Sequence, residues 1–263
     1  MTRNKVVCDL NVWYEFAKGT INPNLLSHQY LVATFVNITE LAQAPNMIKN
    51  PRLFGNVLFA IKRNYSSVIK ANPWEYLIQA FFNDFQPDIS VANKILSGFD
   101  AYMDTSPNSI PINVIEETRV EINKVISEKK SISEPINNAL IPVRQNIKET
   151  GGKKQRHKRT TITSWKRFLS DTALIYSKEF LDKEYKIELD HPSWRHFELL
   201  ILTFEEYFLR LEISNNRKFH MNDWPDLINL VYVQPSDKYW TFENKWNTLF
   251  RETGSLAKYV YGA

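Results

Sequence analysis

The sequence predicts an α/β protein whose central parallel sheet is interrupted along the chain by a large helical insertion. One observation is the short apolar run Val6 to Cys8, which ends at Asp9. A strand without polar alternation is typical of a parallel sheet covered on both faces. A second apolar run, Leu31 to Ala33, leads directly into an amphipathic helix. From Pro87 to Pro192 the sequence predicts several helices and no convincing strand.

Length and composition limit the class of protein. The chain has 263 residues, 43% of them hydrophobic and 24% charged, which excludes a disordered chain and suits one sizeable domain. We predict a single domain, residues 1–263, with its core from 1–85 and 193–263 and the insertion at about 86–192. No apolar run is long enough to span a membrane, and Asp9 interrupts a signal-peptide core, so we expect a cytoplasmic protein. Cys8 is the only cysteine, which excludes an internal disulfide and a thiolate zinc cluster.

Helix-start and helix-stop residues divide the rest of the chain. Gly19 should end a first helix, and Asn50-Pro51 should begin another whose apolar stripe continues to Ile69. The further predicted helices are Trp74 to about Phe85, three in the insertion marked by Ile95 to Tyr102, Ile115 to Ile126 and Ile162 to Phe180, then Trp194 to about Leu211, Asp223 to Val233 and Glu243 to Arg251. The further predicted strands are Lys238 to Phe242 and Ala257 to Tyr261.

Four acids recur where these elements meet. Asp9 and Glu243 each follow a strand, Asp226 is near the start of a helix, and Glu40 is on the helix after a strand. In a parallel sheet such positions face one edge, where open α/β sheets bind ligands. Carboxylates brought together repel unless a cation lies between them. A set of hard oxygen ligands without His or Cys selects Mg²⁺ or Mn²⁺.

Each acid also has a local explanation. Asp9 could cap the following helix, and Glu40 could be an exposed residue on a surface helix. Asp223 with Asp226 is typical of a capping box, and Glu243 is in a first helical turn, where the helix dipole favours an anion.

The four positions together resemble the PIN domain family of metal-dependent ribonucleases and toxins. Asp9 and Asn11 match the family's Asp-x-Asn after an apolar strand, and Thr34 to Leu41 matches its Ser/Thr-x-x-x-x-x-Glu-Leu pattern, which ends in Glu40 and Leu41. Asp226 begins an Asp-x-Ile-x helix. Thr241 to Glu243 matches the Thr-x-Asp turn, with Glu in place of the usual Asp. The resemblance covers about residues 4 to 45 and 220 to 263.

The resemblance implies a PIN-like three-layer α/β/α fold and a Mg²⁺- or Mn²⁺-dependent endoribonuclease. Asp9, Glu40, Asp226 and Glu243 would be catalytic metal ligands, and Asp223 could share the fourth position. Asn11, Thr34 and Thr241 would support them. The family also implies RNA as substrate and, for its toxin members, a cognate antitoxin and a homodimer.

One segment of the chain is strongly basic. Arg144 to Arg167 contains nine Lys or Arg and one acid, a net charge of +8 in a chain of +4 overall, which leaves −4 for the remainder. Within it, the loop at residues 148–159 contains Gly151-Gly152 and five cations that could contact RNA phosphates: Lys153, Lys154, Arg156, Lys158 and Arg159. The alternative is a solvated tether extended by like-charge repulsion.

Two other readings of the chain remain. One is a PIN-like module that binds RNA or protein without efficient cleavage, and its support is the Glu at 243. The other is a helical scaffold whose acids are only caps. Nucleotide-binding glycine motifs and serine-nucleophile motifs are absent, and the spacing of His191 and His196 is poor for zinc.

Overall fold

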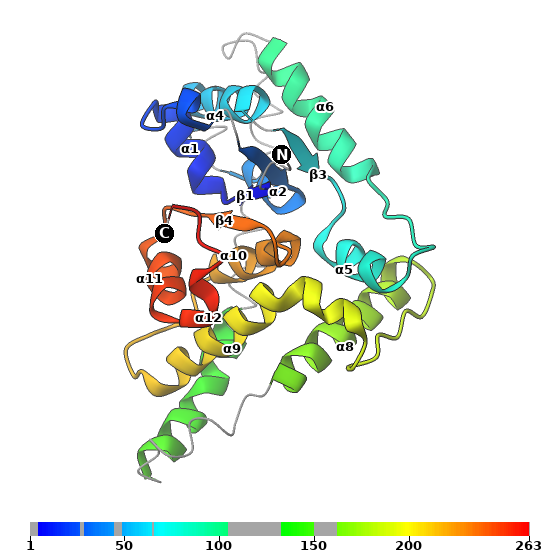
Figure 1. The fold of residues 1–263 in the computed structure, drawn as a ribbon, viewed down its shortest axis with the longest axis vertical. Helices are drawn as coiled ribbons and strands as arrows, with labels where there is room; N and C mark the ends of the chain where they lie inside the picture. The colour runs from blue at the N-terminus through cyan, green and yellow to red at the C-terminus, as the bar shows by residue number, and fades with distance from the viewer. Residues whose placement is uncertain are drawn as a thin grey trace.

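A computed structural model describes residues 5–26, 29–44, 49–64, 66–104, 133–149 and 162–262. Its centre is a four-stranded parallel sheet in the order β3-β2-β1-β4 (Figure 1). In the central strand, Val6 pairs with Leu31 on one side and with Lys238 on the other. The strands are β1 (Lys5–Cys8), β2 (Tyr30–Thr34), β3 (Ser67–Ile69) and β4 (Lys238–Trp240). The predicted α/β class and parallel sheet are confirmed.

Helices make up most of the remaining described chain. The α-helices are α1 (Leu10–Lys18), α2 (Phe35–Ala42), α4 (Pro51–Asn64), α5 (Pro73–Phe81), α6 (Ser90–Asp104), α8 (Ile162–Phe180), α9 (Glu198–Ile213), α10 (Asp223–Asn229), α11 (Asn244–Glu252) and α12 (Gly254–Ala257). The 3₁₀ segments are η1 (Pro23–Leu26), η4 (Pro192–Phe197) and η5 (Leu230–Tyr232). Residues 133–149 are also helical.

Short-range hydrogen bonds fix the strand-to-helix junctions. Gly19 ends α1 in the left-handed conformation, with φ of 75°, which glycine adopts without a steric penalty. Thr34 ends β2 and caps α2, because its side chain accepts a hydrogen bond from the backbone N–H of Asn37 and the Asn37 side chain bonds back to Thr34 N–H. The predicted junction at Thr34 is therefore confirmed.

The two faces of the sheet are buried against different helices. On one face Val6 and Cys8 belong to a core with Trp13 of α1 and Phe54 of α4. On the other, Val7 belongs to a larger core that includes Phe204 of α9 and residues of α5, α10 and α11. Figure 1 shows α1 and α4 to one side of the strands and α9 to α12 to the other. Alternate residues of β1 thus point to opposite cores, as expected for a strand covered on both sides.

The sequence predictions for two segments were wrong, one a missed strand and one a strand that does not form. β3 lies in a stretch predicted to be part of the helix that begins at Pro51, because Val68 and Ile69 follow Ile61 at near-helical spacing. The predicted last strand, Ala257 to Tyr261, contributes only one bridge to the sheet, between Val260 and Tyr239. The chain before it forms the helical turn α12 instead.

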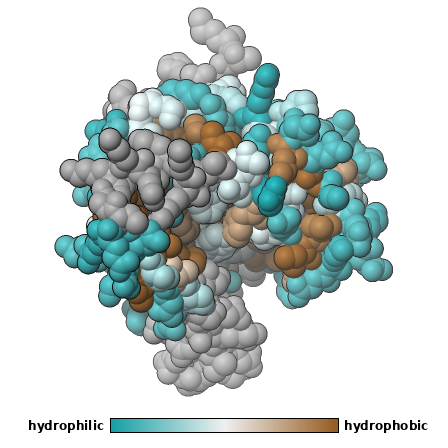
Figure 2. Space-filling model, turned by 90° about the horizontal axis from the view of Figure 1, so that it is seen from below, coloured by the Kyte–Doolittle hydropathy of each residue, from teal (hydrophilic) through white to brown (hydrophobic). Residues whose placement is uncertain are grey.

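The described parts of the region expected to be an insertion contain helices and connecting segments. Between residues 87 and 192 the described parts contain no strand. α8 has its predicted span, and α6 contains the predicted stripe Ile95 to Tyr102 but begins earlier, at Ser90. Leu169 and Ala173 of α8 belong to the same core as α9, so this region shares the main core. The face in Figure 2 has hydrophobic patches among hydrophilic side chains. The predicted helix at Ile115 to Ile126 and the loop cations Lys153 to Arg159 lie outside the described residues.

A membrane-spanning helix was not expected. Among the residues that the structure describes, no helix combines the length and the apolar character that crossing a bilayer requires.

Candidate metal centre

Three of the four predicted acids meet at the carboxyl edge of the sheet. Asp9, Asp226 and Glu243 each offer a carboxylate oxygen within 4.8 Å of the others. They come from three places: the end of β1, the first turn of α10 and the residue before α11. Asp9 and Asp226 are buried, and the Glu243 side chain is 40% exposed. The cluster is therefore open to solvent on the Glu243 side.

Asp9 is held by hydrogen bonds to both oxygens. Oδ1 accepts from the backbone N–H of Leu10 at 2.7 Å, which is the capping bond expected of the local explanation. Oδ2 accepts from Asn11 Nδ2 at 2.7 Å and from the Thr241 hydroxyl at 2.8 Å. Asp9 therefore both caps α1 and faces the other acids.

Asn11 and Thr241 join the two strand ends. Asn11 Oδ1 accepts from the backbone N–H of Phe242 at 2.9 Å, and its Nδ2 donates to Thr241 Oγ1 at 3.1 Å. Thr241 Oγ1 also accepts from Glu243 N–H at 3.1 Å. The turn after β4 is thus fastened to the turn after β1. Asn11 and Thr241, which the family resemblance names as supporting residues, thus both contact the Asp9 carboxylate.

Asp226 and Glu243 do not act as helix caps through their side chains. Asp226 Oδ2 accepts from the Trp246 indole N–H at 2.9 Å. Glu243 is the N-cap residue of α11 but makes no side-chain capping bond. The local explanation therefore accounts for Asp9 in part and leaves the side chains of these two acids without a capping role.

Glu40 and Asp223 lie outside the three-acid group. Glu40 is nevertheless close enough for its charge to raise the pKa of Asp9. Asp223 is buried and accepts hydrogen bonds from the Tyr207 hydroxyl, from His220 N–H and from the Lys245 ammonium. The Asp223 charge is paired with Lys245, whereas the sequence predicted that Asp223 could face a metal ion.

Thr34 lies deeper than the acids and connects α2 to α10. Its hydroxyl donates to Asn229 Oδ1 at 2.6 Å, and both residues are fully or almost fully buried. Its role is to hold the helices that carry Glu40 and Asp226. Asn229 was not predicted as part of the site, because it lies within an apolar run that gives no sign of a buried polar contact.

Burial and mutual repulsion oppose ionisation of the buried acids. Desolvation, followed by the charges of Glu40 and Glu243, raises the pKa of Asp9 to about 7, although the Thr241 hydrogen bond lowers it. Desolvation raises the pKa of Asp226 well above its ordinary value, and the charges of Asp9 and Glu243 add to the rise. Trp246 and Lys245 act in the opposite direction. A divalent cation would remove this repulsion.

A divalent ion with oxygen preference fits this donor set. Asp9, Asp226 and Glu243 supply only carboxylate oxygens, converging from three elements, which suits Mg²⁺ or Mn²⁺ better than zinc. Lys245 was not predicted from sequence, and its ammonium lies on the Asp223 side of the same cluster. Such an internal cation stabilises the acids when no metal is bound.

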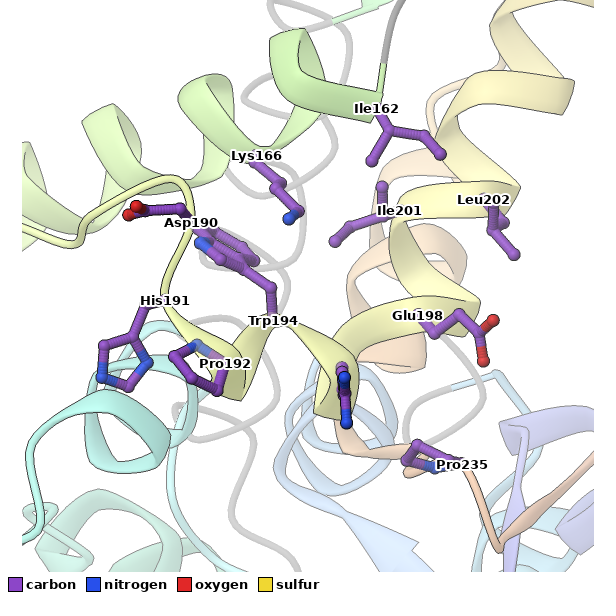
Figure 3. A pocket seen from close by; sticks show the side chains of 11 residues that line it. Ile162, Lys166, Asp190, His191, Pro192, Trp194, Glu198, Ile201, Leu202 and Pro235 are labelled. Carbon is purple, nitrogen blue, oxygen red and sulfur yellow. The ribbon is translucent and has the colours of Figure 1, made fainter.

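A pocket of about 600 Å³ lies near the amino end of β4, whereas the acid cluster lies beyond its carboxyl end (Figure 3). It is lined by side chains of α8, η4 and α9 and by Pro235, which lies in the turn before β4. The acid cluster follows the same strand, so the two sites are at opposite ends of it. Lys166 lies over the ring of Trp194, with its ammonium 5.8 Å from the ring centroid. This pocket belongs to a separate part of the surface.

No family model, curated protein or solved structure matches the chain.

Proposed function

We propose that the protein is a divalent-metal-dependent endoribonuclease with a PIN-like fold. The observation that carries the proposal is the convergence of Asp9, Asp226 and Glu243 at the carboxyl edge of a parallel sheet of order β3-β2-β1-β4. This edge is where open α/β sheets bind ligands. Buried carboxylates with raised pKa values are typical of functional sites, although ion-pair networks also produce them.

Asp9, Asp226 and Glu243 would hold the ion, with Glu40 nearby in an outer position. Bound Mg²⁺ or Mn²⁺ would lower the pKa of water and stabilise charge on a phosphate. The protein's own contribution is orientation. Asn11 and Thr241 fix the Asp9 carboxylate, and the Trp246 indole fixes Asp226. Side chains held in this way lose little freedom when they bind a ligand, which favours binding.

The test is cleavage of a mixed RNA pool by the purified protein with Mg²⁺ or Mn²⁺, with a chelator as control. Asp9→Asn keeps the size of the side chain and should retain the fold, and we expect it to abolish cleavage. Glu15→Gln, at a partly exposed acid of α1 that lies outside the cluster, is the matched control and should leave cleavage unchanged. Cleavage by Asp9→Asn at the wild-type rate would remove the cluster from the reaction.

One observation favours a second function, RNA binding without cleavage. Lys245 already supplies a positive charge beside Asp226 and Glu243, at 3.6 Å and 3.8 Å. An ion-pair network of this kind can be purely structural. The two functions separate in a single experiment, because a module that only binds retains RNA affinity and shows no metal-dependent product.

A further inference from the structure

A second pocket, of about 400 Å³, borders the acid cluster and has the opposite charge. Five of the residues that line it have cationic or titratable nitrogen side chains: Arg210, Arg217, Lys218, His220 and Lys245. Among the residues that the structure describes, no Asp or Glu lines it. A concave surface of this composition favours an anion with several oxygens.

Arg217 and Lys218 are the side chains available to a ligand. Arg210 is engaged, because it pairs with Glu206 and with Glu252, at 2.7 Å in each case. Arg217 and Lys218 are exposed, and the described residues provide neither side chain with a hydrogen bond or ion pair. Neither side chain is therefore paired with a carboxylate of the described residues.

The loop that carries these two cations is held in place from outside. Arg144 donates from Nη2 to the carbonyl of Leu211 at 2.7 Å and to the carbonyl of Arg217 at 2.6 Å. Asn137 exchanges two hydrogen bonds with the backbone of Phe219, at 2.8 Å and 2.9 Å. The helix at residues 133–149 thus fixes both sides of the loop, which reduces the entropy that binding would cost.

The pocket and the acid cluster share a wall. Tyr207 and Lys245 line the pocket, and both contact Asp223. The same Lys245 ammonium lies 3.6 Å from Asp226 Oδ2. Lys245 therefore lines the cationic pocket and also lies beside a proposed metal ligand.

We propose that this pocket binds a phosphate of the RNA strand next to the phosphate that is cleaved, an inference that rests on the proposed nuclease function. Arg217 can contact two phosphate oxygens at once, and Lys218 adds a point charge. Contacts of this kind position a strand without reading its sequence. The pocket would thereby set the direction in which the strand crosses the acids.

The test is binding of a short fluorescent single-stranded RNA over a range of salt concentrations, in chelator so that no cleavage occurs. The variant is Arg217→Gln with Lys218→Gln. The matched control is Arg195→Gln with Lys186→Gln, which removes the same charge from exposed positions in or before η4. We expect the variant to bind more weakly and to lower the slope of log affinity against log salt by about 0.7 for each lost contact, and the control to match wild type.

Three results would overturn the phosphate site. They are an unchanged salt slope in the variant, an equal loss in the control, and a pocket that binds inorganic phosphate while the variant keeps full RNA affinity. Metal-dependent cleavage is measured separately on the same proteins. Loss of the slope without any cleavage by wild type would refute the nuclease and keep the phosphate site, whereas cleavage by wild type with an unchanged slope would refute the site alone.

Discussion

The Lys245 ammonium lies 3.6 Å from the Asp226 carboxylate, and it is paired with the buried Asp223. The ammonium thus supplies positive charge on one side of the acid cluster, where a metal ion would otherwise do so. It also lies over the ring of Trp246, 4.2 Å from the ring centroid. A bound divalent ion and this ammonium would repel each other. The Lys245 ammonium, held by its ion pair with Asp223, should therefore lower the affinity of the acid cluster for a divalent ion.

Replacing Lys245 by Met should separate these two roles. We expect the metal-free protein to lose about 1–3 kcal/mol of unfolding free energy, because Asp223 would remain buried without its partner. The stabilisation by Mg²⁺ should increase, since the repelling charge is gone. Thermal melts with chelator and with Mg²⁺ measure both. A smaller Mg²⁺ response in Lys245→Met than in wild type would contradict the competition, and Lys245→Arg, which keeps the charge, serves as control.

The raised pKa of Asp9 predicts how stability depends on pH. The folded protein holds this proton up to a pKa of about 7, whereas an unfolded Asp releases it near its ordinary value of 3.8. The folded state therefore binds more protons between these values, and stability in chelator should fall as pH rises, by at most about 1.4 kcal/mol per unit for one proton. Asp226 shifts in the same direction.

Metal should reverse this trend, because ligand carboxylates must be deprotonated to bind it. Melts from about pH 5 to about pH 8, with and without Mn²⁺, measure the two slopes. A protein whose metal-free stability rises over this range would not have the buried acids described above.

Thr241→Val tests how the supporting hydroxyl acts. The change removes a donor to Asp9 and an acceptor for Asn11 and Glu243 at almost constant volume. We expect a loss of about 1–3 kcal/mol in stability. The pKa of Asp9 should rise further, because the Thr241 hydrogen bond lowers it, so the rising limb of the cleavage rate against pH should move to higher pH. Thr241→Ser should restore both, and a Val variant with reduced rate but an unmoved pH profile would limit Thr241 to a structural role.

Phe242 is a candidate base-stacking residue. The residue is 46% exposed although it lies between Thr241 and Glu243, and its backbone N–H donates to Asn11. Stacking of one base on an aromatic ring contributes about 1–3 kcal/mol. We expect Phe242→Ala to lower affinity for single-stranded RNA by that amount, with stability changed by less than about 0.5 kcal/mol. Equal RNA affinity of the Ala variant and wild type would exclude stacking, and Phe242→Tyr should bind as wild type does.

Sequence patterns located the parts of the site that depend on local structure. Asp9 ends an apolar strand and Thr34 begins a capped helix, and both signals are contained within a few residues. β3 was missed because three residues are too few to show a period of two. The end of the chain was misjudged because Tyr259 and Val260 are buried without forming a full strand.

The role of Lys245 could not be predicted, for a different reason. Its partner Asp223 is on α10, and the pairing depends on how α10 and α11 pack together. The sequence places Lys245 only two residues after Glu243 and says nothing about which way it points. Contacts between elements distant along the chain, such as Thr34 with Asn229, have the same origin.

Asp226→Asn distinguishes a crowded metal site from an acid that interacts only with the helix dipole of α10, without using a substrate. The Asn side chain can still accept the Trp246 indole N–H, and one charge is removed from the cluster. We therefore expect the variant to melt at or above wild type in chelator, against the usual cost of about 1 kcal/mol for a point change. Mg²⁺ or Mn²⁺ should stabilise wild type by about 2.7 kcal/mol at a hundredfold excess over the dissociation constant, and the variant by less. If Asp226 interacts only with the helix dipole, the variant should lose about 0.3–1 kcal/mol of stability with or without metal. A variant that is less stable and keeps the full ion response would remove Asp226 from the site.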